Sequence, residues 1–219
     1  MLLPDLFVSF LLPLAILAQQ AVLAKRNRTS YFPAHSAIDI ELGTCAPLTV
    51  IYARGTNEPG NIGSVIGPRM FWTFSNALNG NIALQGVSYP ADSEGNVVRG
   101  AKGAPEMTRM VKLAKEQCSE SKVALIGYSQ GAFVTHYTLN QDPPLSELVD
   151  AVVVFGDPEL PTNGTFGNVS SDKIKSYCNE DDQVCTAGVG NITDGHKAYM
   201  ISDAIEAVSF VLNVTGLDS

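Results

Sequence analysis

The feature that most constrains the fold of this 219-residue sequence is the regular alternation of short apolar runs with longer amphipathic segments. Apolar, β-branched runs separated by helices are typical of a parallel sheet covered by helices on both faces. We therefore expect one α/β domain. The expected strands cover residues 48–53, 84–89, 123–126, 151–155 and 174–178, and the expected helices cover residues 71–78, 104–117, 132–139 and 198–214.

The N-terminus carries an apolar run, residues 6–18, that is too short to span a bilayer. Together with the small residue Ala24 it predicts a signal peptide over residues 1–24, although Asp5 stands where a basic residue is usual. We therefore expect a secreted, extracellular protein without a membrane span.

A dibasic pair follows this leader directly and suggests a second processing site. The hypothesis is a short propeptide that ends at Arg26, within an N-terminal segment over residues 25–44. The folded domain is then expected over residues 45–219.

Two kinds of residue fit the secretory pathway. The four cysteines allow three pairings, and we favour Cys45 with Cys118 and Cys178 with Cys185, since an even count in an oxidising compartment indicates disulfides. No Cys–His spacing resembles a zinc site, so we expect no metal. Asn-x-Ser/Thr acceptors for N-glycans begin at Asn27, Asn163, Asn168, Asn191 and Asn213.

The acidic composition limits the choice of partners. The formal net charge is -8 and the sequence pI is about 4.8. A nucleic-acid-binding face needs clustered Lys and Arg, so we do not expect nucleic acid as a partner. A monomer is the default expectation.

The segment from Gly127 to Gly131 reads Gly-Tyr-Ser-Gln-Gly and stands between an expected strand and an expected helix. This context is required for a nucleophile elbow, in which the serine projects from a sharp strand-to-helix turn. The free N–H groups of the following helix would point toward a developing oxyanion. Ser129 is therefore the candidate nucleophile.

A serine hydroxyl needs a histidine to take its proton and a carboxylate to orient that histidine. Of the three histidines, His35 precedes the first strand and His136 shares a helix with the serine, which leaves His196 as the base. In the order Ser, acid, His, the acid falls in the loop between Cys178 and Cys185. Position alone does not choose between Asp181 and Asp182.

These motifs together closely resemble the cutinase family of secreted fungal serine esterases. The family implies a lidless α/β-hydrolase with about five parallel strands and no cofactor. The resemblance covers roughly residues 45–214, and it is carried by the segment 53–60, the Gly127–Gly131 motif, the Cys178–Cys185 loop and His196.

The resemblance also implies a role for each candidate residue. In the family the acid stands three residues before the second cysteine of its small loop, which corresponds to Asp182 here. The nucleophile and base correspond to Ser129 and His196. The oxyanion donors correspond to the backbone N–H of Gln130 and to the hydroxyl of Thr56, where cutinases more often have serine.

The implied activity is hydrolysis of esters in cutin or similar aliphatic polyesters, and of short-chain esters, through an acyl-enzyme. One alternative is an acetylxylan esterase, because residues 156–158 resemble those relatives, and the loop 186–195 has only Val189 and Ile192 as apolar anchors. A glycan on Asn191 would stand beside the cleft. A second alternative is a secreted recognition protein on a hydrolase scaffold without activity.

Overall fold

The computed structural model describes residues 34–188 and 190–218. The expected signal peptide, the dibasic pair and Asn27 lie outside these residues. The described part of the N-terminal segment packs on the domain: Ile38 bridges to Gln85, and Ala37 and Ile40 are buried. The packed domain therefore begins before Cys45.

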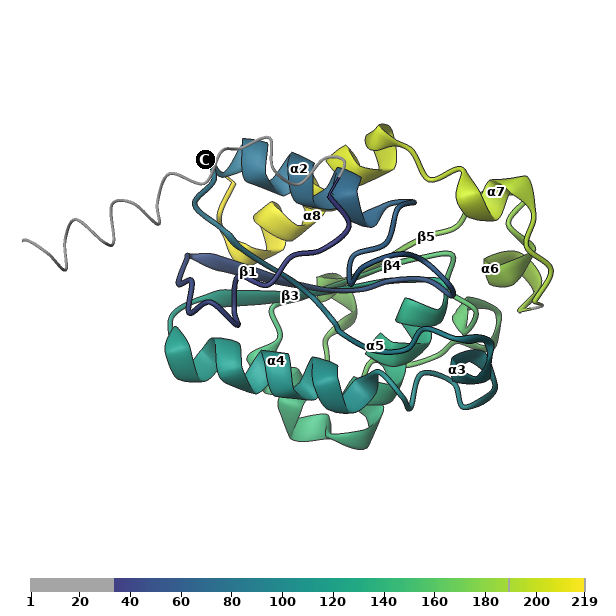
Figure 1. Cartoon of the computed structure of the whole chain (residues 1–219), viewed down its shortest axis with the longest axis horizontal. Coiled ribbons are helices and arrows are strands. Elements are labelled where there is room, and N and C mark those ends of the chain that lie inside the picture. Colours follow the sequence, from purple (N-terminus) through teal and green to yellow (C-terminus); the bar gives the residue numbers. More distant parts are fainter. Residues whose placement is uncertain (1–33, 189, 219) are drawn as a thin grey trace, which may run out of the picture.

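The structure is an α/β fold built on a five-stranded parallel sheet, as predicted. The strand order is β2-β1-β3-β4-β5, so β1 and β3 lie inside the sheet (Figure 1). The chain adds β2 on one side of β1 and then crosses to add β3 on the other side. In sheets of this kind, ligand sites form at the carboxyl ends of the strands near such a switch point. The strands are β1 (Leu48–Ala53), β2 (Ala83–Gly86), β3 (Lys122–Tyr128), β4 (Ala151–Phe155) and β5 (Ile174–Tyr177).

Helices cover both faces of the sheet (Figure 1). On one face α2 (Gly67–Ala77) packs beside α8 (Ile201–Thr215), and on the other α4 (Ala104–Gln117) packs beside α5 (Gln130–Gln141). Three short helices lie in the connections: α3 (Ser93–Val97), α6 (Gln183–Ala187) and α7 (Asp194–Lys197).

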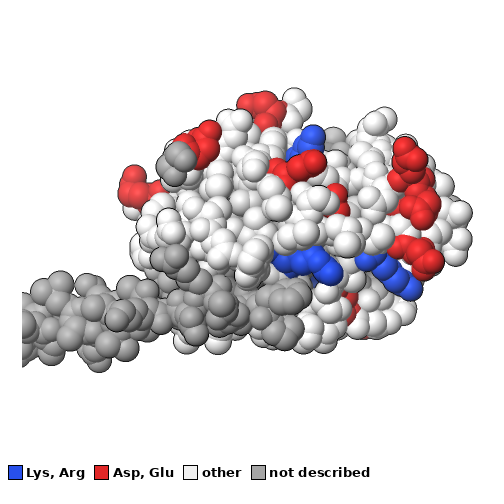
Figure 2. Space-filling view, turned by 90° about the horizontal axis from the view of Figure 1, so that it is seen from above, with Lys and Arg blue, Asp and Glu red and all other residues white. Residues whose placement is uncertain are grey.

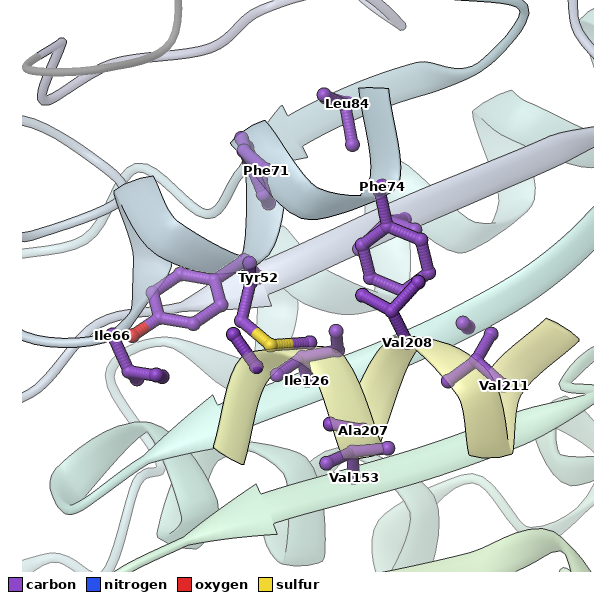
Figure 3. Close-up of a cluster of buried hydrophobic side chains, with 14 of the residues drawn as sticks. Tyr52, Ile66, Phe71, Phe74, Leu84, Ile126, Val153, Ala207, Val208 and Val211 are labelled. Atoms are coloured by element: carbon purple, nitrogen blue, oxygen red, sulfur yellow. The ribbon is translucent and has the colours of Figure 1, made fainter. Parts of the chain in front are cut away.

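The period-2 alternation of each strand divides the core into two buried clusters. Tyr52, Ile126 and Val153 pack against α2 and α8, as Figure 3 shows. Their neighbours in sequence, including Ile51 and Leu125, pack against α4 and α5. Because both faces are buried, β1, β3 and β4 are largely apolar, which is why they could be predicted from sequence, whereas the edge strand β5 is only partly buried.

The expected and observed elements differ in several places: α2 begins at Gly67 and not at residue 71, β3 runs on to Tyr128, and α5 covers Gln130–Gln141. The second strand ends at Gly86, because β2 is an edge strand and the segment after it turns toward Pro90. The expected helix over residues 198–214 begins three residues later, at Ile201, because residues 198–200 form the connection between α7 and α8. The short helices α3, α6 and α7 were not predicted. Of these, α3 and α6 each start at an aspartate N-cap, Asp92 and Asp182, that accepts a backbone N–H.

The surface is mostly uncharged. Figure 2 shows scattered acidic side chains with fewer basic ones among them on the face it views. Across the ranges that the structure describes, no helix is both long and apolar enough to cross a membrane.

Candidate active site

Ser129 sits on a strained turn between β3 and α5. Its backbone adopts φ 56° and ψ -117°, which is unfavourable for a residue with a side chain. The flanking glycines make the turn possible, since a Cβ on Gly127 would lie 2.5 Å from the Gly131 oxygen and one on Gly131 would collide with Ala53. The Ser129 N–H donates to the Phe155 carbonyl at 2.9 Å, which ties the turn to β4.

His196 and Asp182 form a buried pair. Nδ1 of His196 lies 2.9 Å from each carboxylate oxygen of Asp182, and the two residues are 2% and 0% exposed. The backbone N–H of Val184 donates to Oδ1 at 2.9 Å, and the hydroxyl of Tyr199 donates to Oδ2 at 2.6 Å. Burial alone would raise the pKa of Asp182, but the hydrogen bonds from His196 and Tyr199 outweigh it and lower the pKa.

This arrangement determines which nitrogen of the base is free. An ionised carboxylate only accepts hydrogen bonds, so Nδ1 of His196 must carry the proton that it shares with Asp182. In the neutral ring Nε2 is then the unprotonated nitrogen. Nε2 is buried and makes no hydrogen bond to any residue that the structure describes. His196 can therefore accept a proton at Nε2.

The His196 ring is held at the same end of the sheet as Ser129. Tyr128, the residue before Ser129, stacks on the His196 ring with centroids 5.2 Å apart, and its hydroxyl donates to the His196 carbonyl at 2.7 Å. A Cβ on Gly156 would lie 2.7 Å from Cε1 of His196 and 2.9 Å from Oδ2 of Asp182. The carboxyl ends of β3 and β4 thus frame the imidazole.

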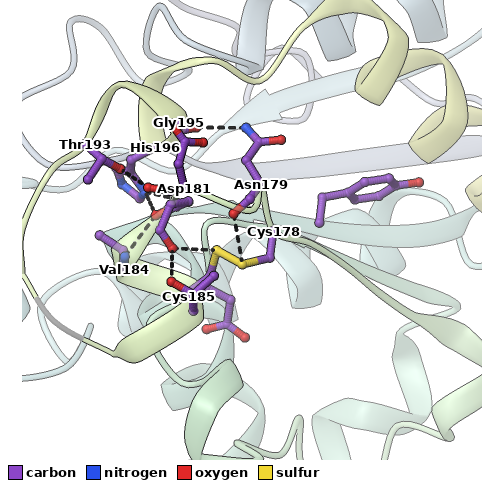
Figure 4. Close-up of a disulfide and its surroundings, with 12 residues drawn as sticks. Cys178, Asn179, Asp181, Val184, Cys185, Thr193, Gly195 and His196 are labelled. Carbon is purple, nitrogen blue, oxygen red and sulfur yellow. Dashed lines mark hydrogen bonds and ion pairs between the residues drawn. A yellow bond between two sulfur atoms is a disulfide. The ribbon is translucent and has the colours of Figure 1, made fainter.

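The two disulfides are those of the favoured pairing, Cys45–Cys118 and Cys178–Cys185. The second closes the loop that carries the acid (Figure 4). Of the two candidate carboxylates in that loop, Asp182 is the one bonded to His196, whereas Asp181 is exposed.

Side-chain hydrogen bonds join this loop to the segment that carries the base (Figure 4). Asn179 donates to the Gly195 carbonyl at 2.8 Å, and Thr193 donates to the Asp181 carbonyl at 2.6 Å. The disulfide loop and the turn into α7 therefore form one braced unit.

The predicted oxyanion residues, Thr56 and Gln130, lie together in the structure. Gln130 is the first residue of α5, where a backbone N–H has no intrahelical acceptor. Its side-chain nitrogen donates to the Thr56 hydroxyl at 3.0 Å and to the Asp92 carbonyl at 2.7 Å. Asn96, on α3, also donates to the Thr56 hydroxyl at 3.0 Å. The Thr56 hydroxyl in turn donates to Oδ1 of Asn96 at 3.3 Å, the longest of these contacts.

The carboxylate of Glu58 fixes the loop that carries Thr56. Oε2 of Glu58 accepts the Gly55 N–H at 2.7 Å, and Oε1 accepts the N–H groups of Ser64 and Val65 at 2.7 and 2.8 Å. Arg54 donates from Nε to the Glu58 carbonyl at 2.8 Å. A donor in this loop is thus pre-positioned, as oxyanion stabilisation requires.

Sequence reasoning missed three residues of this site, Asn96, Tyr199 and Gly156. Each acts through a contact between segments far apart in the chain. The only local signals were the Asp92 helix cap before Asn96 and the Gly-Asp-Pro turn after β4. As for metals, the described part of the chain contains no group of three or more His, Cys, Asp or Glu that could hold an ion.

A serine on a strand-to-helix elbow, with a His–Asp pair at the carboxyl end of a parallel sheet, defines a serine hydrolase of the α/β-hydrolase fold. Comparison with known proteins agrees. The family model for cutinase matches residues 44–215. The chain is 39% identical to cutinase 4 of Emericella nidulans over 177 residues, 79% of this chain and 74% of that protein. It is 37% identical to a cutinase of Blumeria hordei, over 87% of this chain and 83% of that protein.

Solved structures give the same result. A Trichoderma reesei cutinase in complex with a phosphonate inhibitor matches with a TM-score of 0.75 and 29% identity, covering 93% of this chain and 92% of that chain. An acetylxylan esterase matches with a TM-score of 0.58 and 22% identity, covering 79% and 100%, which supports the fold alone. The chain belongs to the cutinase family and is a serine carboxylic ester hydrolase.

Proposed function

We propose that this protein hydrolyses the ester bonds of cutin or a similar aliphatic polyester, and short-chain esters, with Ser129 as nucleophile and His196 as base. The observation that carries the proposal is the His196–Asp182 pair, which leaves Nε2 unprotonated at the end of the sheet where the Ser129 elbow lies. Thr56 and the backbone N–H of Gln130 supply the oxyanion hole.

The reaction proceeds in two half-reactions. Oγ of Ser129 bonds to the ester carbonyl carbon while its proton passes to Nε2 of His196, and the carbonyl oxygen becomes an oxyanion held by Thr56 and Gln130. His196 then gives the proton to the departing alkoxide as the carbon–oxygen bond breaks. Water repeats these steps on the acyl-enzyme, releasing the acid and regenerating Ser129. Asp182 stays ionised and stabilises the imidazolium.

Exposed apolar side chains near these residues support an aliphatic substrate. Val97 follows Asn96 on α3 and is 80% exposed, and Ile192, four residues before His196, is 49% exposed. Aliphatic groups in water at the rim of a site favour binding of an apolar chain. Acetate alone would gain little from them.

We also propose that the protein is secreted and glycosylated. The leader over residues 1–24 and the two disulfides support secretion. The four acceptor asparagines that the structure describes are all exposed and thus accessible to modification: Asn163, Asn168, Asn191 and Asn213. The side chain of Asn191 donates to Gln183 at 2.7 Å, so a glycan there would replace a contact beside α6.

The test is the initial rate on p-nitrophenyl acetate, butyrate, hexanoate and palmitate, with release of soluble acids from purified cutin and of acetate from acetylated xylan in parallel. We expect a maximum at butyrate or hexanoate and monomer release from cutin. Activity on acetyl esters only, with deacetylation of xylan, would instead establish the carbohydrate esterase.

Two variants assign the activity to the proposed serine. Ser129→Ala is expected to abolish turnover and covalent labelling by a fluorophosphonate while the protein stays folded. Ser176→Ala is the matched control, because the Ser176 hydroxyl is buried on β5 and makes no hydrogen bond to a described residue. Full activity in Ser129→Ala would refute the mechanism, and the absence of labelling in the wild type would favour a scaffold protein.

A further inference from the structure

Among the described residues, Tyr199 is the one buried side chain outside the proposed triad that donates to Asp182. It lies in the turn between α7 and α8, three residues after His196, and is 1% exposed. Its hydroxyl is 2.6 Å from Oδ2 of Asp182 and 3.3 Å from the Tyr177 carbonyl. Both neighbours only accept hydrogen bonds, so the phenolic proton goes to the nearer and charged one, Asp182.

The phenol ring is held so that its hydroxyl cannot turn away. It packs edge-on against Tyr128 and Phe155, with centroid separations of 5.9 and 5.5 Å. Tyr128 ends β3 directly before Ser129, and Phe155 ends β4. The strands that frame the base therefore also aim the Tyr199 hydroxyl. Burial, followed by the hydrogen bond to Asp182 and then the charge of Asp182, raises the pKa of Tyr199, which favours the protonated, donating form.

We propose that Tyr199 is a positioning residue for the ester hydrolysis assigned above: its hydroxyl and the Val184 N–H clamp the two oxygens of Asp182 and thereby fix the orientation and charge of the carboxylate that faces His196. Nδ1 of His196 is equidistant from both oxygens and so does not itself select a carboxylate orientation. The Val184 N–H holds only Oδ1. Without Tyr199, Oδ2 keeps the imidazole as its sole donor among the described residues.

The clamp also limits how strongly Asp182 attracts the proton on the base. A carboxylate that shares its charge with a phenol is a weaker partner for the imidazolium than one that lacks this donor. Removing the hydroxyl is therefore expected to make His196 hold its proton more tightly. The base would then be protonated over a wider acidic range, and turnover would need higher pH.

The test is Tyr199→Phe, which keeps the ring and removes only the hydroxyl. We expect kcat to fall about tenfold, equivalent to about 1.4 kcal/mol of transition-state stabilisation, with KM for p-nitrophenyl butyrate nearly unchanged. The acid limb of kcat/KM is expected to move to higher pH. Tyr177→Phe is the matched control, since Tyr177 stacks on Phe155 in the same aromatic cluster but its hydroxyl does not contact Asp182. It should keep the wild-type kcat and pH profile.

A double-variant cycle separates this role from a purely structural one. In the Asp182→Asn background the proposed acceptor charge is gone, so adding Tyr199→Phe should cost little further activity. If Tyr199→Phe does not fold, 3-fluorotyrosine at position 199 provides the second measurement: it is a stronger donor and is expected to shift the acid limb to lower pH.

The inference rests on the proposed function, and the same assays distinguish the two. Wild-type activity that persists in Ser129→Ala would overturn both. Ser129-dependent activity with kcat and pH profile unchanged in Tyr199→Phe would overturn only the role of Tyr199. An equal loss in the wild-type and Asp182→Asn backgrounds would also overturn it, because the hydroxyl would then not act through Asp182.

Discussion

The protein contains two buried His–Asp pairs, and they differ in what the histidine can still do. His196 and Asp182 lie beside the serine elbow, whereas His136, on α5, bonds through Nε2 to Asp157, just beyond β4, at 3.1 and 3.0 Å. Both histidines are nearly inaccessible, at 2% and 1% exposure. By distance and burial alone the two pairs are hard to tell apart.

The second nitrogen of each ring makes the difference. Nδ1 of His136 lies 2.8 Å from the Thr165 carbonyl, which can only accept, so both nitrogens of this ring must donate and the imidazolium is favoured. Burial alone would lower the pKa of His136, but Asp157 and the Thr165 carbonyl raise it overall. Nε2 of His196 has no such acceptor among the described residues. A base needs an unoccupied nitrogen, and of these two rings only that of His196 has one among the described residues.

The surroundings reinforce this contrast. His136 stacks on Phe166 with centroids 3.8 Å apart, and Asp157 also accepts the N–H of Glu159 at 2.9 Å. Glu159 is in turn bonded to Arg99 at 2.8 Å, beyond α3. The His136 pair therefore joins α5 to the loop after β4. We expect this pair to act as a structural brace, and the His196 pair to act in the proposed proton transfer.

The largest expected effect comes from exchanging each histidine for glutamine. His196→Gln is expected to lower kcat/KM by at least about 10⁴-fold, because no other group takes the serine proton. His136→Gln is expected to keep near wild-type kcat/KM on p-nitrophenyl butyrate. A comparable loss of turnover in a folded His136→Gln protein would show that the two pairs are not functionally distinct.

Substitutions at Gly156 and Gly164 test the same contrast between the two His–Asp pairs, because each added methyl group would crowd one of the histidines. A Cβ at Gly156 meets His196 and Asp182, and Gly156 has φ +56°, while a Cβ at Gly164 meets His136 at 2.9 Å and Glu159 at 2.6 Å. Gly156→Ala is expected to reduce kcat about 100-fold by displacing the base. Gly164→Ala is expected to lower thermal stability without a matching loss of kcat. Steady-state kinetics and melting curves on both variants provide the comparison, and equal kinetic losses would contradict it.

The Asp157→Asn variant tests how much the His136–Asp157 pair contributes to stability. Removing one charge from this buried pair is expected to lower the free energy of unfolding by about 2–3 kcal/mol, because His136 loses its counter-ion. Urea unfolding at neutral pH measures the change, and the esterase rate of the folded fraction should remain close to wild type. Unchanged stability would mean that the brace contributes nothing net.

The smallest expected effect is the pH dependence of the stability that His136 contributes. Since the pKa of His136 is raised in the folded state, its contribution to stability is fully present below the unfolded value of about 6.5 and is lost as pH rises through the folded value. The difference in unfolding free energy between wild type and His136→Gln should therefore be largest in acid and shrink toward alkaline pH. Chemical unfolding from pH 5 to 9 tests this, and a difference that grows with pH would reverse the assigned sign.

The sequence predicted the parts of the molecule that repeat or that stand next to one another in the chain. The central strands β1, β3 and β4 are largely apolar, and the Gly-Tyr-Ser-Gln-Gly turn lies in one segment, so local pattern was enough for both. The choice between Asp181 and Asp182 is different, because adjacent residues have the same composition and only the fold shows that one is buried and bonded to His196. The family resemblance supplied that choice.

Contacts between distant segments could not be predicted in this way. Nothing near Tyr199 in the sequence indicates that its hydroxyl meets Asp182, since this depends on the aromatic ends of β3 and β4. Likewise, His136 was set aside because it shares a helix with the serine, and the Asp157 pair was not foreseen. The tertiary structure decides which donors and acceptors surround each histidine ring.

The order of the proposed triad along the chain has a consequence for biosynthesis. The strained serine turn is translated well before the disulfide loop, the turn that carries His196 and the helix α8 that packs over β4 and α2. A nascent chain therefore holds its nucleophile without a base until the last helix has been made and docked. Prematurely terminated products that lack residues 182–215 would carry the intact Gly-Tyr-Ser-Gln-Gly motif without the proposed acid and base, and we expect them to be inert.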